Sequence, residues 1–365
     1  MVKTGSIDLP LHFCKCPRWL FKRMKELSGE IIFAIIDEYG TKELLFRLSN
    51  PLFFQALGCV LGFDWHSSGL TTTVSAALKE GSGNESGIAF CGGKGKTSRK
   101  TPEEIEFKAN EFGFSDKKIE TLIKATRLSA KVDNSCIQDG YQLYHHLFVF
   151  DEDGNWAVIQ QGLNEDSGYA RRYHWFNSDS FVDSPKESII GIKKHNVLNL
   201  VSGKSREVRK TSVDIVKDNP VHLKNELNSQ QTLFGHFVMP QRHEILSLDI
   251  NERDWKILHE IYELQPKDYE ELVSLKGVGG KTLRSLALLS KIIYGCEADW
   301  EDPIKYSFAH GGKDGIPYPV DKKNYDSSIE FLRNLIEERK IGGERYKETL
   351  RRLATFFDFS YFIIL

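Results

Sequence analysis

A glycine-rich turn holds the residues with the clearest chemical implication. The chain reads Leu275-Lys-Gly277-Val-Gly279-Gly280-Lys281-Thr282-Leu283 at this point. Glycines adopt positive φ angles and let backbone N–H groups approach a phosphate oxygen, and a helix that begins after them points its positive end at the same anion. Asp268 and Glu271 have the spacing of a capping pair for the preceding helix, and Gly295 is expected to end the following one. The pattern predicts a helix, an anion-binding turn and a second helix.

This segment resembles the helix-hairpin-helix motif, which contacts DNA backbone without reading sequence. The alternative is an ordinary helical hairpin with a glycine turn. In base-excision enzymes with this motif that cut the strand, a lysine directly follows the turn, and Lys281 matches it. Those enzymes place an aspartate within a Val-Asp pair downstream, for which Asp321 is the candidate, although it lies 40 residues after Lys281 and could instead be a helix cap. The expected DNA contacts are Gly277, Val278, Gly279, Gly280 and Thr282.

A wider resemblance rests on strings spread along the chain. They include FQALGCVLGFDWHSSGLTT from residue 54, GGKGK from 92, DGYQLYHH from 139, RRYHW from 171 and FAHGGKDGIPYPVD from 308. Together they are similar to a prokaryotic family long carried as a domain of unknown function, one member of which is assigned as an abasic-site DNA lyase with an unfamiliar fold. The resemblance implies a DNA repair lyase that acts on abasic sites, with or without glycosylase activity on an unidentified base.

Lyase chemistry of this kind needs one uncharged lysine amine. The amine attacks the sugar aldehyde, and the resulting iminium drives loss of the 3′ phosphate by β-elimination, without a metal or other cofactor. Burial or a second cation favours the uncharged form. We expect the amine to be that of Lys281, which lies at a helix N-terminus. The next candidate is Lys94, because the positive charge of Lys96 would disfavour its protonated form. Lys79, after an apolar run, and Lys313 are further candidates.

Two other regions could contact DNA. The segment from Lys94 to Lys100 has no acidic residue, and Lys96, Arg99 and Lys100 are expected to bind phosphates. Polar side chains also follow the strands predicted between 141 and 175, where strict alternation would place Tyr144 with His146 on one face and Leu143 with His145 on the other. Arg171, Arg172 and His146 are predicted to contact a sugar or a flipped nucleotide, the alternative being a polar network inside the core.

Two alternative functions stay open. The same hairpin could serve a non-catalytic DNA-binding protein, and Asp64, His66, Asp151 and Asp153 could belong to a metal-dependent nuclease. A nucleotide-binding P-loop is excluded because Phe90 stands where that pattern needs glycine. Two segments, at 230–237 and 353–357, weakly resemble peptides that dock on sliding clamps.

Composition narrows the class of protein. The chain has 365 residues, 40% of them hydrophobic, and a formal net charge of −2, so nucleic acid must be bound by local basic patches such as the six Lys/Arg residues between 192 and 211. The six scattered cysteines suggest reduced thiols and a cytoplasmic protein, and the apolar runs are too short to span a bilayer. No membrane partner is expected.

The elements that would position these residues predict an α+β fold. Helical spacing is found from Pro17 to Tyr39, strand-like composition at Thr71–Val74 and Gly87–Cys91, a helix capped by Thr101, and a β-hairpin with an Asp-Gly turn after Tyr141. We expect an α+β N-terminal domain with antiparallel hairpins at 1–183, a basic connector at 184–245 and an all-α domain with the hairpin motif at 246–365.

Overall fold

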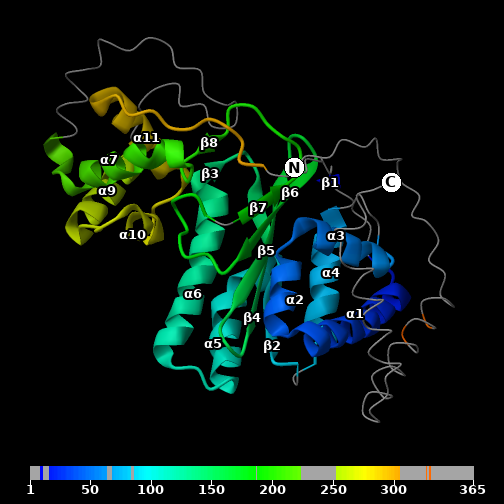
Figure 1. Cartoon of the computed structure of the whole chain (residues 1–365). Coiled ribbons are helices and arrows are strands. Elements are labelled where there is room, and N and C mark those ends of the chain that lie inside the picture. The colour runs from blue at the N-terminus through cyan, green and yellow to red at the C-terminus, as the bar shows by residue number, and fades with distance from the viewer. Residues whose placement is uncertain are drawn as a thin grey trace.

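The computed structural model is an α+β structure in which helices cover both faces of an antiparallel sheet (Figure 1). It describes residues 9–10, 16–63, 68–83, 86–185, 187–222 and 252–304, together with Asp326 and Ile329. The predicted α+β class is confirmed. Separate domains are not shown, because one cluster of buried hydrophobic side chains extends from Ala89 in the sheet to Leu289 in the last described helix. None of the helices in the described ranges combines the length and apolar character that a bilayer crossing needs.

The sheet has the strand order β1-β6-β5-β4-β2, and β7 also pairs with β6. The strands are β1 (Leu9–Pro10), β2 (Ile88–Lys94), β4 (Gln142–Asp151), β5 (Trp156–Asn164), β6 (Tyr169–Phe176) and β7 (Glu187–Ile190). The predicted hairpin is β4–β5, in which Phe150 pairs with Trp156 and Gly154 in the turn has a φ of 82°. The strand expected at Gly87–Cys91 is β2, so both of these sequence predictions are confirmed.

Four helices pack on one face of the sheet. They are α1 (Arg18–Tyr39), α2 (Thr41–Leu48), α3 (Pro51–Val60) and α4 (Ser68–Gly81). The strand expected at Thr71–Val74 is wrong, because these residues lie in α4. Leu70, Val74, Ala77 and Leu78 are fully buried at helical spacing, and this apolar stripe outweighs the β-propensity of three consecutive threonines.

Helices α5 (Thr101–Glu111) and α6 (Asp116–Lys131) cover the opposite face. Strand β2 leads into α5 through a short 3₁₀ helix, η1 (Gly95–Lys100). Thr101 is therefore the first residue of α5 and not its cap, and its hydroxyl donates a hydrogen bond to the Ser98 carbonyl at 2.7 Å. The helix itself is confirmed, and it begins one residue earlier than the sequence predicted.

The remaining helices of the described ranges gather at the C-terminal end of α6 (Figure 1). They are α7 (Arg206–Lys217), α9 (Glu252–Leu264), α10 (Tyr269–Ser274) and α11 (Gly280–Tyr294). A π-helical turn (Val132–Cys136, η2) follows α6 and leads to β3 (Ile137–Gln138), which pairs with β8 (Leu198–Asn199); a further 3₁₀ helix, η3, spans Gly203–Ser205. Thus residues 184–217, expected as a connector, contribute β7, β8 and α7 to the packed structure.

A β-bulge interrupts the pairing of β4 with β5 between Leu143 and His145. Tyr144 and His145 consequently both reach α4: the Tyr144 hydroxyl accepts a hydrogen bond from Gln161, which also donates to the Ser68 carbonyl, and His145 lies 3.1 Å from the Ser75 hydroxyl. The face assignment predicted from strict alternation is therefore wrong, because the extra residue shifts the register.

Candidate nucleic-acid interface

The glycine turn joins two helices as the sequence predicts. Asp268 caps α10 by accepting a hydrogen bond from the Glu271 amide at 2.8 Å, and the Glu271 carboxylate accepts one from the Lys267 amide at 2.9 Å. This capping pair is confirmed, as is Gly295 in the left-handed conformation at the end of α11. Gly277 has a φ of 89°, which explains why glycine is needed in the turn.

The N-cap residue of α11 is Gly279, which has no side chain with which to cap the helix. A residue with no side chain at this position leaves room for an outside anion to approach the first-turn amides. Gly277 and Lys281 are exposed, Gly279, Gly280 and Thr282 are half-buried, and Val278 is buried. The turn is thus accessible, and its one apolar side chain anchors it to the protein.

Polar contacts fix the turn against the end of α6. The Gln138 side-chain amide donates to the Gly280 carbonyl at 2.7 Å, and the Gln138 side-chain oxygen accepts from Nε of Arg284 at 2.7 Å. Burial lowers the pKa of Arg284 to about 10. On the other side of the turn, Nζ of Lys131 donates to the Leu275 carbonyl at 3.1 Å.

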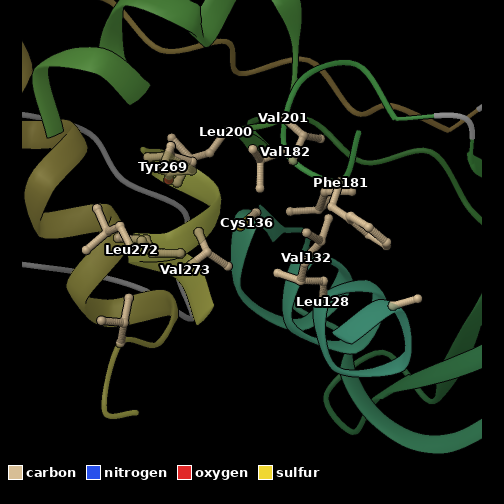
Figure 2. Packing of buried hydrophobic residues seen from close by; sticks show 14 of the residues in the cluster. Leu128, Val132, Cys136, Phe181, Val182, Leu200, Val201, Tyr269, Leu272 and Val273 are labelled. Carbon is tan, nitrogen blue, oxygen red and sulfur yellow. The ribbon is translucent and has the colours of Figure 1, made fainter. Parts of the chain in front are cut away.

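Sequence reasoning missed these three polar residues. The sequence did contain a signal for Arg284. This residue stands on the same helical face as Ala287, in a mostly apolar stripe, and a charge in such a stripe needs a buried partner. The sequence contained no such signal for Gln138 and Lys131, because their role depends on where the hairpin docks. Hydrophobic contacts complete that docking: Figure 2 shows Leu272 and Val273 of α10 in the same cluster as Val132 and Cys136.

A cluster of exposed cations follows β2. Lys94, Lys96, Arg99 and Lys100 are all exposed on η1 or at its start, and none forms an ion pair with an acidic residue in the described part of the chain. Nζ of Lys94 lies 5.8 Å from the centre of the Tyr144 ring, so the bulge that turns Tyr144 also places this lysine. Gly92 is required here because a Cβ atom would lie 2.3 Å from the His146 carbonyl.

The start of β4 connects this basic loop to the glycine turn. Lys94 pairs with His145 in the sheet, and the backbone amide of Leu143, two residues earlier, donates to the Asn134 side chain at 3.2 Å. The next residue, Ser135, packs against Gly280. The basic loop and the hairpin therefore belong to the same end of the β4 strand.

Lys79 lies close to this loop, with its amine held inside the protein. It donates to the Glu104 carboxylate at 2.5 Å and to the Gly92 carbonyl at 2.9 Å, while the Gly92 amide donates to the same carboxylate at 2.7 Å. This arrangement fastens β2 to α4 and α5. The amine of Lys79 is occupied by these contacts.

Arg171, Arg172 and His146 lie in the core. Their burial agrees with the alternative interpretation of the sequence, which is a polar network inside the core. Arg171 is fully buried and bonds Asp139 at 2.9 Å and Asp302 at 2.7 Å. These two carboxylates together hold its pKa above the ordinary value in spite of burial. No DNA phosphate can reach this guanidinium without opening the core.

Arg172 is also fully buried, and its hydrogen bonds go to the His174 ring, the Thr71 hydroxyl, the Gln55 side chain and the Pro51 carbonyl. Burial lowers its pKa to about 9. His146 lies between Thr126 and Gln160, at 2.5 and 2.8 Å. These strand residues hold the sheet and its helices together.

The basic segment between 192 and 211 is largely neutralised by nearby acidic residues. Arg206 and Arg209 both contact Asp183, Lys204 pairs with Glu301, and Lys210 pairs with Glu207. Nζ of Lys194 lies 4.4 Å from the centre of the Tyr141 ring. The positive surface charge of the segment between 192 and 211 is therefore weaker than its composition suggests.

Several predicted residues lie outside the described part of the chain. They are Asp321, Lys313, Asp64, His66 and the clamp-like segments at 230–237 and 353–357. Of the remaining nuclease candidates, Asp151 is buried and accepts hydrogen bonds from Thr41 and Asn155. Within the described ranges, no three His, Cys, Asp or Glu residues are grouped so that they could hold a metal ion.

An antiparallel sheet with helices on both faces and a docked glycine hairpin places the chain among the α+β proteins. It belongs to the family described as "Protein of unknown function (DUF763)", whose family model matches residues 5–320. No curated protein and no solved structure matches the chain.

Replacing His146 with Gln should make the free energy of unfolding decrease less steeply as the pH is lowered. Burial, opposed in part by the hydrogen bond with Gln160, lowers the pKa of His146 from 6.5 to about 4. Between these pH values the unfolded chain binds more protons than the folded protein, so the stabilisation is complete above pH 6.5 and is lost toward pH 4, at up to about 1.4 kcal/mol per pH unit.

Denaturant unfolding between pH 6.5 and 4.5 measures this slope. His259→Gln, at an exposed position of α9, is the control and should keep the slope of the unchanged protein. A slope for His146→Gln as steep as that of the control would contradict the buried, uncharged state of this imidazole.

Proposed function

We propose that this protein is a DNA repair lyase that cleaves abasic sites through a Schiff base and β-elimination. The observation that carries the proposal is the glycine turn, with the accessible N-terminus of α11 beside it and, at the same end of β4, a row of exposed cations that form no ion pair with a described acidic residue. Backbone amides at a helix N-terminus together with exposed lysines and arginines are suited to phosphates of any sequence.

The step from DNA binding to lyase chemistry has two supports. The first is the resemblance of the sequence strings described above to a family with one member assigned as an abasic-site lyase. The second is the presence of lysines beside the proposed binding site for the DNA backbone. An attacking amine must be uncharged and must reach C1′ of the opened sugar. Lys281 and Lys94 are exposed next to the phosphate-binding elements, and Lys79 is held by Glu104. The chemistry needs an amine and water only, so it proceeds in the presence of a chelator.

The direct test incubates the protein with an abasic-site duplex in EDTA, with and without borohydride. The proposal predicts strand cleavage in EDTA and a covalent protein–DNA adduct with borohydride, because reduction traps the iminium. A mobility shift with neither cleavage nor adduct would show a non-catalytic binder. Cleavage that occurs only with added Mg²⁺ or Mn²⁺ would show a nuclease, and either result would overturn the proposal.

Replacing both Lys96 and Arg99 with Ala should weaken binding to duplex DNA and should make the binding affinity less dependent on salt concentration. Each phosphate contact contributes about 0.9 to the slope of log K against log salt concentration, so the double variant should lose about 1.8 from that slope. Fluorescence anisotropy at a series of salt concentrations measures it.

The matched control replaces Lys204 and Lys210 with Ala. Both are also exposed, but each is paired with a glutamate. Their loss should leave the slope nearly unchanged. Equal losses of slope in the two double variants would contradict the assignment of the β2 loop as the phosphate-binding surface.

A further inference from the structure

A pocket of about 420 Å³ opens between α6 and the end of α10. Its lining residues are Glu120, Ile123, Lys124, Arg127, Leu128, Lys131 and Ser274. The volume lies within the range of small-molecule sites in proteins. One helical face thus supplies three cations and two aliphatic side chains to a cavity that adjoins the glycine hairpin.

Lys131 connects this pocket to the hairpin. It is the last residue of α6, it is half-buried, and its amine donates to the carbonyl of Leu275, the first residue of the turn. That acceptor is neutral. Burial lowers the pKa of Lys131, and the buried Cys136 thiol opposes the shift only in part. The amine is therefore shifted toward the uncharged form that a nucleophile requires.

A second cation in the pocket is placed to bind a DNA phosphate next to a sugar that reaches Lys131. Arg127 lies one helical turn before Lys131, is exposed, and forms no ion pair with any described acidic residue. Lys124, in contrast, pairs with Glu270 at 2.6 Å and so joins α6 to α10. A guanidinium binds phosphate oxygens in a bidentate manner, which would fix the backbone while the sugar enters the pocket.

We propose that this pocket receives the ring-opened deoxyribose of an abasic site and that Lys131 is the amine that forms the Schiff base. The assignment rests on the proposed function and replaces Lys281 as the expected nucleophile. Lys281 then lies beside the backbone phosphates, on the outer side of the turn. Lys131 lines the pocket and donates to the carbonyl of Leu275 in the hairpin, so phosphates held at the turn would present the neighbouring sugar to Lys131.

The reaction balances with these groups and water. The Lys131 amine attacks C1′ of the aldehyde, and the carbonyl oxygen leaves as water with one proton from the amine and one from solvent. The C=N iminium that forms keeps the second amine proton. The C2′ proton then passes to water in the pocket, its electron pair forms the C2′=C3′ double bond, and the C3′–O bond breaks as the phosphate leaves as an anion. Hydrolysis of the imine returns the amine and releases an unsaturated aldehyde.

Borohydride trapping on an abasic duplex tests the assignment. Lys131→Ala and Lys131→Arg should each reduce the trapped adduct at least 100-fold, while Lys117→Ala, an exposed position on α6 outside the pocket, should remain within twofold of the unchanged protein. Lys131→Arg preserves the charge and a donor for Leu275, so it should still bind the duplex with an affinity within threefold by anisotropy.

Proteolysis and mass spectrometry of the adduct formed by the unchanged protein give a readout that needs no variant. A modified Lys131 supports the proposal. An adduct mapped to Lys281, Lys94 or any other lysine overturns the assignment and leaves the lyase function standing. The absence of any adduct from the unchanged protein would overturn the proposed function and this assignment with it.

Discussion

The docking of the glycine hairpin against the end of α6 is the constraint on which the other functional features depend. Hydrophobic contacts of Leu272 and Val273 with the cluster around Val132 supply most of the attraction (Figure 2). The chain of hydrogen bonds from Arg284 through Gln138 to Gly280 fixes the orientation. A glycine turn on a loose helical pair would present its amides in many directions. Here the turn is held, and its exposed side faces outward at a defined place.

Charge is distributed so that only part of the positive surface is available to a partner. The chain has a net charge of −2, and the cations between 192 and 211 mostly meet acidic neighbours, whereas the η1 cations meet none in the described part of the chain. Inside the core, Arg171 is neutralised by two carboxylates, and Arg172 relies on neutral acceptors. Local geometry, rather than composition, therefore decides which cations could contact DNA.

Local signals in the sequence predicted local structure well. The capping pair at Asp268 and Glu271, the glycine at the end of α11 and the β4–β5 hairpin follow from short-range rules, and each is confirmed. The failures involve tertiary context. Three threonines entered a helix because its apolar stripe faces the sheet, and one extra residue in β4 reversed the faces of Leu143 and Tyr144. The burial of Arg171 depends on Asp302, which is 131 residues away, so no short-range pattern could have predicted it.

Hydrogen exchange of backbone amides, with and without an abasic-site duplex, tests the central claim most directly. If the docked turn and the basic loop form one DNA-binding surface, bound duplex should slow exchange at residues 277–282 and at residues 95–100 together, while amides on the α1 face keep their rates. Protection that appears only on other surfaces, with both of these segments unchanged in the bound state, would contradict the account.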